Sequence, residues 1–438
     1  MLSNGACSLN PHEDRFAFSA IFIIDKKGQL YDKWFGRTII HSDKRFTYEN
    51  AQEILTRYND VAKLADSDSA NKNQFTPAYE AALNDLPWFD GRDTKVGDPE
   101  NQDPKLFAHE LLEFNRIAKI YQEIKRANGA LDFETTEIKF KLDEEGRPIA
   151  VYKKERIDTH KLVEEFMLLA NREVSMFVDT HNREDGKERP GVFRVHDQPD
   201  PDRIKELSLF VHALGFDFDT SHAENTSTNK KKKKGISPKQ LQKLLNDVTG
   251  TPQEGMIKIA TLRSMAKAIY AIHDLGHFGL NFDHYTHFTS PIRRYPDLMV
   301  HRILADLLDG KIVSQQRAPE FTKICADSTR REIEAADAER SSVKYKQVEY
   351  MMDKVGQEFD VTISGIADFG MFVQEPEAMA EGLIRLVNLK PDDYYSADTK
   401  NYRIVGEKTG TEFHLGDKLH VRLENANLED KMLDFRLV

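Results

Sequence analysis

Cysteine is scarce in this chain, which has only Cys7 and Cys325 among its 438 residues. Two cysteines so far apart in sequence exclude a disulfide framework and a metal site built from cysteine thiolates. Free thiols are typical of proteins in a reducing compartment, so we expect a cytoplasmic protein.

Long apolar runs are also missing. The longest, such as residues 20–24, are far shorter than the roughly 20 residues needed to cross a bilayer. Residues 1–5 lack the basic segment and apolar core of a secretory signal. We therefore expect no contact with a membrane.

Positive charge is not in excess either, since 73 Asp and Glu stand against 62 Lys and Arg, giving a formal net charge of −11. This balance excludes a uniformly basic coat, so any RNA binding has to come from local basic groups. At 438 residues the chain exceeds what one hydrophobic core usually organises, which predicts two or more domains.

The patterns of the first half predict a hairpin and a buried helix. Residues 14–40 read as two strands around a Lys26-Lys27-Gly28 turn. Within residues 158–178 apolar side chains recur at helical spacing and mark one buried face. These side chains are Val163, Phe166, Met167, Ala170, Val174 and Phe177.

The second half predicts two more helices and then a change of period. Pro296 near the start and Gly310 after the end delimit one helix. A charge-rich helical stretch follows over residues 320–354, and after Gly356 short strands alternate with glycines and acidic turns. We place a domain boundary at this change.

A lysine-rich stretch precedes this region. Residues 221–235 are polar and include five successive lysines, which indicates a solvated loop. Contact of these lysines with a phosphate backbone is the alternative.

The most informative segment is residues 284–302, with the sequence HYTHFTSPIRRYPDLMVHR. It places two arginines and two hydroxyl groups just before a helix, whose free amides and positive dipole end can receive an anion. Guanidinium groups hold phosphate oxygens in bidentate fashion and neutralise charge that develops during phosphodiester cleavage. The alternative is a helix cap with solvated arginines.

This segment resembles the signature of the RNB family, the catalytic domain of ribonucleases II and R. Four further motifs support the resemblance in the same order along the chain. They are LSNGACSLNP at residues 2–11, HKLVEEFM at residues 160–167, FRVHD at residues 193–197 and GHFGL at residues 276–280. The resemblance implies an α+β fold in which a mixed sheet and helices form the catalytic domain.

The resemblance also implies roles for two catalytic residues. Arg293 matches the arginine at the scissile phosphate, and Glu339 matches a carboxylate that lines the catalytic cavity. Arg294, next to Arg293, is expected to bind RNA.

Three residues are expected to contact RNA by the same resemblance. Tyr48 and Glu164 resemble residues that contact the terminal nucleotides, and Phe133 resembles an aromatic on which RNA stacks. The alternatives are that Tyr48 and Phe133 are core aromatics and that Glu164 is a solvated flank residue.

Magnesium is the cofactor that the resemblance implies. Family members hold it with a run of aspartates that activates water, and we expect that run upstream of Leu2, so that the amino-terminal part of the catalytic domain is missing here. Asp217-Phe218-Asp219 imitates the run but lies in a polar, variable region, so we assign no metal ligand in this chain. Asp392 and Asp393 are better explained as an exposed turn.

Clustered histidines offer a competing interpretation as a metal-dependent hydrolase. Imidazoles can bind zinc or iron, but no helical His-x-x-x-His pair stands beside an acidic partner here. The histidines in question are His273, His277, His284, His287 and His301.

Residues 355–438 resemble an S1 domain, an all-β OB-fold barrel that binds RNA. Alternating apolar residues with glycines at bends suit a small, strongly curved barrel. Phe369 and Phe372 are expected to stack on bases, or alternatively to fill the barrel. Arg385 stands where S1 domains often carry histidine and is expected to attract phosphate.

Together these patterns predict a catalytic domain over residues 1–352 and an S1 domain over residues 355–438. The implied function is a 3′-to-5′ exoribonuclease that processively hydrolyses single-stranded RNA from its 3′ end to nucleoside 5′-monophosphates. No obligate protein partner is implied. The alternative is a non-catalytic RNA-binding module or an inactive fragment, because the aspartate run is absent from this chain.

Overall fold

The computed structural model describes residues 5, 7–56, 107–131, 137–183, 186–220, 235–251, 253–389, 393–399 and 401–438. The chain forms two compact units, each assembled from separate stretches. The first contains Met1–Ala130, Arg156–His196 and Ala268–Ala326, and the second contains Leu131–Glu155, Asp197–Lys267 and Asp327–Val438. Within the described part, every helix is too short or too polar to pass through a bilayer.

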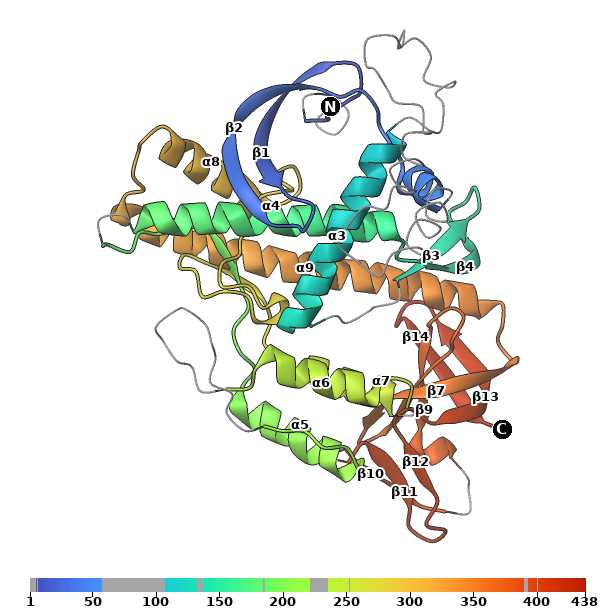
Figure 1. Cartoon of the computed structure of the whole chain (residues 1–438). Helices are drawn as coiled ribbons and strands as arrows, with labels where there is room; N and C mark the ends of the chain where they lie inside the picture. Colours follow the sequence, from blue (N-terminus) through green and yellow to red (C-terminus); the bar gives the residue numbers. More distant parts are fainter. Residues whose placement is uncertain are drawn as a thin grey trace, which may run out of the picture. The chain divides into compact units, whose positions relative to one another are not determined.

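The first unit begins with the predicted antiparallel hairpin, which is confirmed. β1 (Asp14–Ile24) pairs with β2 (Leu30–His41) along nearly their whole length. The Asp25 carboxylate accepts two backbone N–H groups of the turn at 2.7 and 2.8 Å, and Gly28 adopts the positive φ of 80° that the turn requires. Figure 1 shows the hairpin as a curved ribbon.

Helices and short strands complete the first unit. They are α3 (Ala108–Asn128), α4 (Asp158–Asn182), α8 (Tyr295–Leu308), β5 (Phe193–Val195), β6 (Ile269–Ala271), η2 (Phe278–Leu280) and η3 (Gln315–Arg317). The core joins the hairpin to α4, β5 and α8 through buried side chains such as Phe35, Val174, Phe193 and Ile303. The apolar stripe predicted for α4 is therefore confirmed, except that Val163 near its start remains 37% exposed.

The second unit holds a hairpin and three short helices. The hairpin pairs β3 (Glu137–Leu142) with β4 (Pro148–Lys154). The helices are α5 (Pro201–Ala213), α6 (Pro238–Val248) and α7 (Glu254–Ser264). Asp200 and Ser237 cap α5 and α6 with their side chains, and a proline occupies the first turn of each helix.

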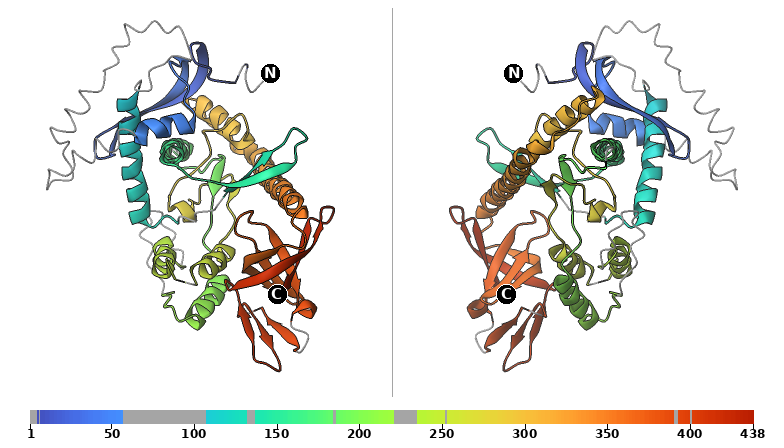
Figure 2. Two further views of the ribbon diagram at one scale, coloured as in Figure 1. Left: turned by 90° about the vertical axis from the view of Figure 1, so that its right-hand side faces the viewer. Right: turned by 90° about the vertical axis from the view of Figure 1, so that its left-hand side faces the viewer.

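The long helix α9 (Ala318–Met352) confirms the helical prediction for residues 320–354. Its first residues belong to the first unit and the remainder, from Asp327, belongs to the second. Residues 333–340 in its middle are exposed. Figure 2 shows this helix from two further sides, with the β3–β4 hairpin lying beside it.

A closed five-stranded barrel ends the chain and begins where the period of the sequence changes. Its strands are β7 (Glu358–Ala367), β8 (Gly370–Gln374), β9 (Glu381–Arg385), β13 (Lys418–Asn427) and β14 (Met432–Leu437). A separate three-stranded sheet lies between β9 and β13 in sequence. It contains β10 (Tyr395–Asp398), β11 (Arg403–Gly406) and β12 (Glu412–His414), and it follows η4 (Leu386–Asn388).

Asp393 confirms the turn predicted just before this sheet, whereas Asp392 lies outside the described residues. The Asp393 carboxylate accepts hydrogen bonds from the Thr409 hydroxyl and from three backbone N–H groups. These bonds, the Thr409 hydroxyl foremost, lower the pKa of Asp393 to about 2. The hydrogen bonds of this carboxylate thus stabilise the loop.

The packing of the barrel can be tested by a substitution at Gly382. A Cβ at this position would lie 2.5 Å from the buried Phe435 ring and 2.8 Å from the Leu433 carbonyl oxygen. We expect Gly382→Ala to destabilise the barrel by about 1–3 kcal/mol and to accelerate amide hydrogen exchange in β13 and β14. Gly255→Ala is the matched control, because a Cβ there meets no atom within 4 Å. Equal exchange in the two variants would contradict this view of the packing.

Candidate phosphate-binding site

Buried hydrogen bonds fix the backbone path of residues 284–294, the segment that leads into α8. Thr286 donates its hydroxyl to the Val192 carbonyl oxygen at 2.7 Å. The side chain of Asn171, on α4, accepts the Phe288 N–H at 2.9 Å and donates to the Tyr285 hydroxyl at 3.3 Å. Because these groups are buried, releasing any of them leaves a polar atom without a partner.

Asp297 in the first turn of α8 fixes the end of the segment. Its side chain is fully buried and accepts the Ser290 N–H at 2.8 Å and the Arg294 guanidinium at 2.7 Å. A buried carboxylate is stable only when paired, so Asp297 holds Arg294 in place. Arg294, expected from the sequence to bind RNA, thus has a structural partner in this unit.

Arg293 differs from its neighbour because its side chain is exposed. Its Nη2 lies 3.5 Å from the Ser290 Oγ, a marginal contact that leaves most donors of the guanidinium fork directed elsewhere. The turn held by Asp297 therefore presents Arg293 to solvent at the start of α8. This is the geometry that an arginine needs to meet a phosphate.

Buried histidines next to these arginines report a positive electrostatic environment. Burial, followed by the nearby charges of Arg294, Arg194 and Arg293, lowers the pKa of His287 to about 2. Burial, with His196 and Arg194 close by, lowers the pKa of His277 to about 3. Both imidazoles are therefore neutral, and the three guanidinium groups make the region attractive to an anion.

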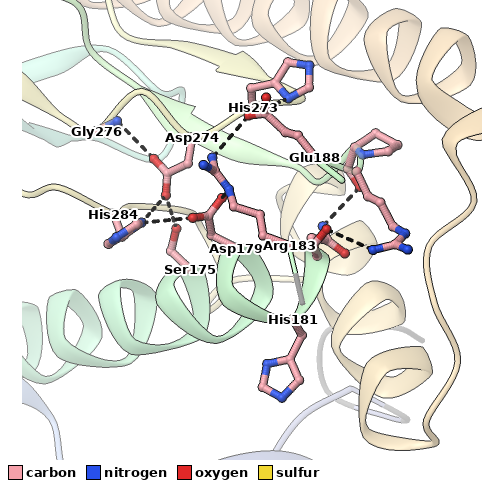
Figure 3. Close-up of polar contacts among 12 residues, drawn as sticks. Ser175, Asp179, His181, Arg183, Glu188, His273, Asp274, Gly276 and His284 are labelled. Carbon is pink, nitrogen blue, oxygen red and sulfur yellow. Dashed lines mark hydrogen bonds and ion pairs between the residues drawn. The ribbon is translucent and has the colours of Figure 1, made fainter. Parts of the chain in front are cut away.

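A second polar cluster, shown in Figure 3, anchors the beginning of the segment at His284. Asp274 Oδ2 accepts the Ser175 hydroxyl and His284 Nδ1, each at 3.0 Å, and its Oδ1 accepts the Gly276 N–H at 3.0 Å. Asp179 Oδ2 lies 3.8 Å from the same His284 nitrogen. The hydrogen bond to Asp274 is the main cause that raises the pKa of His284.

This cluster does not form a nucleophile–base pair. Ser175 and His284 both bond to Asp274, but no hydrogen bond joins them in the described part of the chain. A serine nucleophile needs an adjacent base to accept its proton. The cluster instead ties α4 to the segment that carries Arg293.

Asn171, Ser175 and Asp179 carry much of this anchoring and were not predicted from the sequence. They follow one another at intervals of four residues and so form one line along α4. Asn171 and Ser175 are buried beside the apolar stripe of this helix. A regular line of small polar residues next to such a stripe is the signal that could have revealed them.

Tyr48 and Glu164 each lie near the start of α4. The Tyr48 ring, 44% exposed, lies 4.3 Å from the His160 ring, and Thr159 donates its hydroxyl to the Tyr48 carbonyl oxygen at 3.0 Å. Glu164, one helical turn after His160, forms ion pairs with Arg156 and, at 3.6 Å, with Lys125. Tyr48 is thus a half-exposed ring and not a core aromatic.

The remaining predicted residues lie elsewhere. Phe133 lies outside the described residues. Glu339 is exposed on α9 in the second unit. In the barrel, Phe369 is 56% exposed with its ring centroid 6.1 Å from that of Phe372, and Arg385 is exposed in β9 opposite Gly370.

The residues that the structure describes do not fit a magnesium site. They contain no group of three or more His, Cys, Asp or Glu side chains placed to hold a metal ion. Asp217 and Asp219 are exposed on either side of Phe218, which is buried, so that phenylalanine anchors the chain there. The histidines singled out by the sequence include His287, 2.8 Å from the Tyr270 hydroxyl, and His301, which donates to the Phe288 carbonyl oxygen at 2.8 Å.

The Asp274–His284 contact predicts a pH dependence of stability. Since the folded-state pKa of His284 lies above its ordinary value of 6.5, its stabilisation is complete below pH 6.5 and is lost as the pH rises through the folded pKa. We expect the stability difference between the wild type and His284→Gln to shrink as the pH is raised from about 6 to about 9. Urea titrations measure this stability difference. The charged residues Asp179, Asp283 and Arg183 are the same in both proteins, so the comparison isolates His284. A difference that stays constant or grows contradicts this assignment.

Comparison with known proteins places this geometry in a family. The model of the RNB domain matches residues 1–310. Ribonuclease R of Aquifex aeolicus is 31% identical over 443 residues, which cover 100% of this chain and 54% of that protein. Ribonuclease R of Thermotoga maritima is 33% identical over 445 residues, which cover 100% of this chain and 54% of that protein. The chain thus spans about half the length of these curated relatives.

Solved structures show the same fold. RNase R of Mycoplasma genitalium in complex with ribose-methylated single-stranded RNA matches 100% of this chain and 60% of its own, with a TM-score of 0.74 and 24% identity. The yeast pseudonuclease Ssd1 matches 92% of this chain and 43% of its own, with a TM-score of 0.58 and 16% identity. Because the RNB domain matches residues 1–310 and ribonuclease R relatives match the full length of the chain, the chain belongs to the RNB family of exoribonucleases.

Proposed function

We propose that this chain forms part of a 3′-to-5′ exoribonuclease that removes nucleotides processively from the 3′ end of single-stranded RNA and releases nucleoside 5′-monophosphates. The observation that carries the proposal is the exposed Arg293 guanidinium beside Arg194 and Arg294, the arginines whose charges add to burial in lowering the pKa of His287. The ribonuclease R relatives support the same activity.

Arg293 has the principal role in this proposal. Its guanidinium fork binds two oxygens of the scissile phosphate and stabilises the additional negative charge of the phosphorane. Asp297 holds the turn and keeps Arg294 beside it, so the backbone that carries Arg293 is in place before RNA arrives. Glu339 is proposed, from the family resemblance, as a further catalytic carboxylate.

The other predicted residues are proposed to guide RNA. Tyr48 and Glu164, which share the start of α4, would contact the terminal nucleotides, and Phe133 would stack on RNA. Residues 1–352 are proposed as the catalytic domain and residues 355–438 as an S1 domain. There, exposed Phe369 and its neighbour Phe372 would stack on bases without regard to sequence.

Magnesium is proposed for the whole enzyme, in which it would supply an activated water. The described residues do not form its site, so their proposed role is confined to binding RNA and stabilising charge. This lack of a carboxylate cluster in the described part favours one alternative, a non-catalytic RNA-binding module.

The two functions differ in their products. The experiment incubates the whole protein to which this chain belongs with 5′-labelled single-stranded RNA and magnesium and resolves the products on a denaturing gel. A ladder that shortens from the 3′ end with release of mononucleotides supports the exoribonuclease. Bound but intact RNA supports the binding module, and internal cuts contradict both.

Substitution of Arg293 tests its role. In the whole protein, we expect Arg293→Lys to keep RNA affinity within about twofold but to lower turnover at least about tenfold, because lysine cannot reproduce the bidentate fork. Arg331→Lys, at an exposed position of α9, is the matched control and should behave as the wild type. Turnover within a factor of about two of the wild type would remove Arg293 from the chemistry.

Stacking on the barrel has a separate test. The double variant Phe369→Ala with Phe372→Ala should bind single-stranded RNA at least about fivefold more weakly, with an unchanged dependence on salt, because stacking releases few counterions. Titrations at several salt concentrations measure both quantities. Tyr394→Ala, which removes a 68% exposed ring at another place, is the control. Unchanged affinity with a folded barrel would make both phenylalanines structural.

A further inference from the structure

The β3–β4 hairpin carries a basic and aromatic face whose residues have no function assigned in the proposed exoribonuclease. Its register places Lys139 opposite Tyr152, Lys141 opposite Ala150 and Glu137 opposite Lys154. Directly paired residues of an antiparallel hairpin share a face, and so do residues two positions apart on one strand. Three lysines and one tyrosine therefore stand together on one face, with a single carboxylate.

This face is open to solvent. Tyr152 is 54% exposed, and the lysine side chains are exposed as well. The opposite face contains the half-buried residues Ile138, Phe140 and Val151. The exposed ring is therefore not explained by packing within the hairpin.

The hairpin contacts α9 through its turn. Lys346 of α9 donates to the Gly146 carbonyl oxygen in the hairpin turn at 2.6 Å. Figures 1 and 2 show the hairpin beside α9 in every view. This hydrogen bond restrains the turn, which reduces the conformational freedom that the hairpin loses when it binds a partner.

The charge of the face is positive although the whole chain carries −11. Glu137 accepts Lys139 at 2.7 Å and Lys154 at 3.0 Å, so one carboxylate is shared by two ammonium groups. Lys141 forms no ion pair with the residues that the structure describes. A positive surface with an exposed ring suits a polyanion that also has flat apolar groups.

The position of the face connects it to α9. The pKa of Lys139 is raised mainly by its hydrogen bond to Glu137, and Glu339 of α9 adds to the rise. Glu339 is thus close enough to act on Lys139 electrostatically. The face therefore borders the part of α9 that holds a proposed carboxylate of the active site.

We propose that this face of the β3–β4 hairpin binds single-stranded RNA, with the Tyr152 ring stacked on a base and Lys139, Lys141 and Lys154 in contact with phosphates. The proposal rests on the proposed RNA-processing function and adds a binding site to it. Stacking requires no particular base, and lysine contacts with phosphate carry no sequence information. The hairpin thus guides RNA of any sequence along α9.

Fluorescence anisotropy of a labelled oligouridylate, without magnesium, tests the site in the intact chain. Tyr152→Ala should weaken binding at least about fivefold with little change in salt dependence, whereas Tyr152→Phe should bind as the wild type. Lys141→Gln should lower the slope of log affinity against log salt by about 0.7. Lys153→Gln, on the opposite face, and Tyr31→Ala, a 68% exposed ring in β2, are the matched controls.

The outcomes separate this site from the proposed function. If the wild type binds RNA and Arg293→Ala weakens it, but Tyr152→Ala and Lys141→Gln match the wild type, the hairpin site alone is overturned. If the wild type binds no RNA, both proposals fall. Polyglutamate serves as a competitor. If it displaces the labelled RNA as effectively as unlabelled RNA does, and if Tyr152→Ala weakens polyglutamate and RNA binding equally, the face is a site for acidic proteins. The RNA assignment is then overturned.

Discussion

The buried Asp297 carboxylate is the constraint on which the candidate site depends. It cannot remain charged in the interior unless its partners stay in place, and those partners are the Ser290 N–H and the Arg294 guanidinium. The same pairing that stabilises Asp297 therefore fixes the turn before α8 and leaves Arg293 outside it. A structural requirement of the core thus determines where the exposed arginine stands.

The electrostatics of this region follow from burial as much as from charge. His287 and His277 lie among guanidinium groups and are too buried to ionise, so they fill space without adding to the positive charge. At the other end of the segment, the protonated form of His284 is favoured by Asp274 and Asp179. One stretch of chain thus uses histidine as a neutral core residue and as a hydrogen-bonding partner of carboxylates, according to the groups that face it.

Much of the fold could be predicted from the sequence because the signals are local. Gly28 with the alternation around it indicates the first hairpin, and Pro296 with Gly310 delimits α8. The anchoring by Asn171, Ser175 and Asp274 could not be predicted, because it depends on which distant segments pack against α4. Nor could local pattern separate Arg293 from Arg294, since their difference arises from a buried carboxylate and not from their own sequence positions.

The central claim is that the 3′ end of single-stranded RNA binds at the segment held by Asp297. Photocrosslinking tests it most directly, with RNA that carries a photoreactive nucleotide at its 3′ end and mass spectrometry of the digested adduct. We expect attachment within residues 284–302, and loss of that attachment when the photoreactive nucleotide is moved to the 5′ end. Attachment confined to the barrel, or equal labelling from both ends, would contradict it.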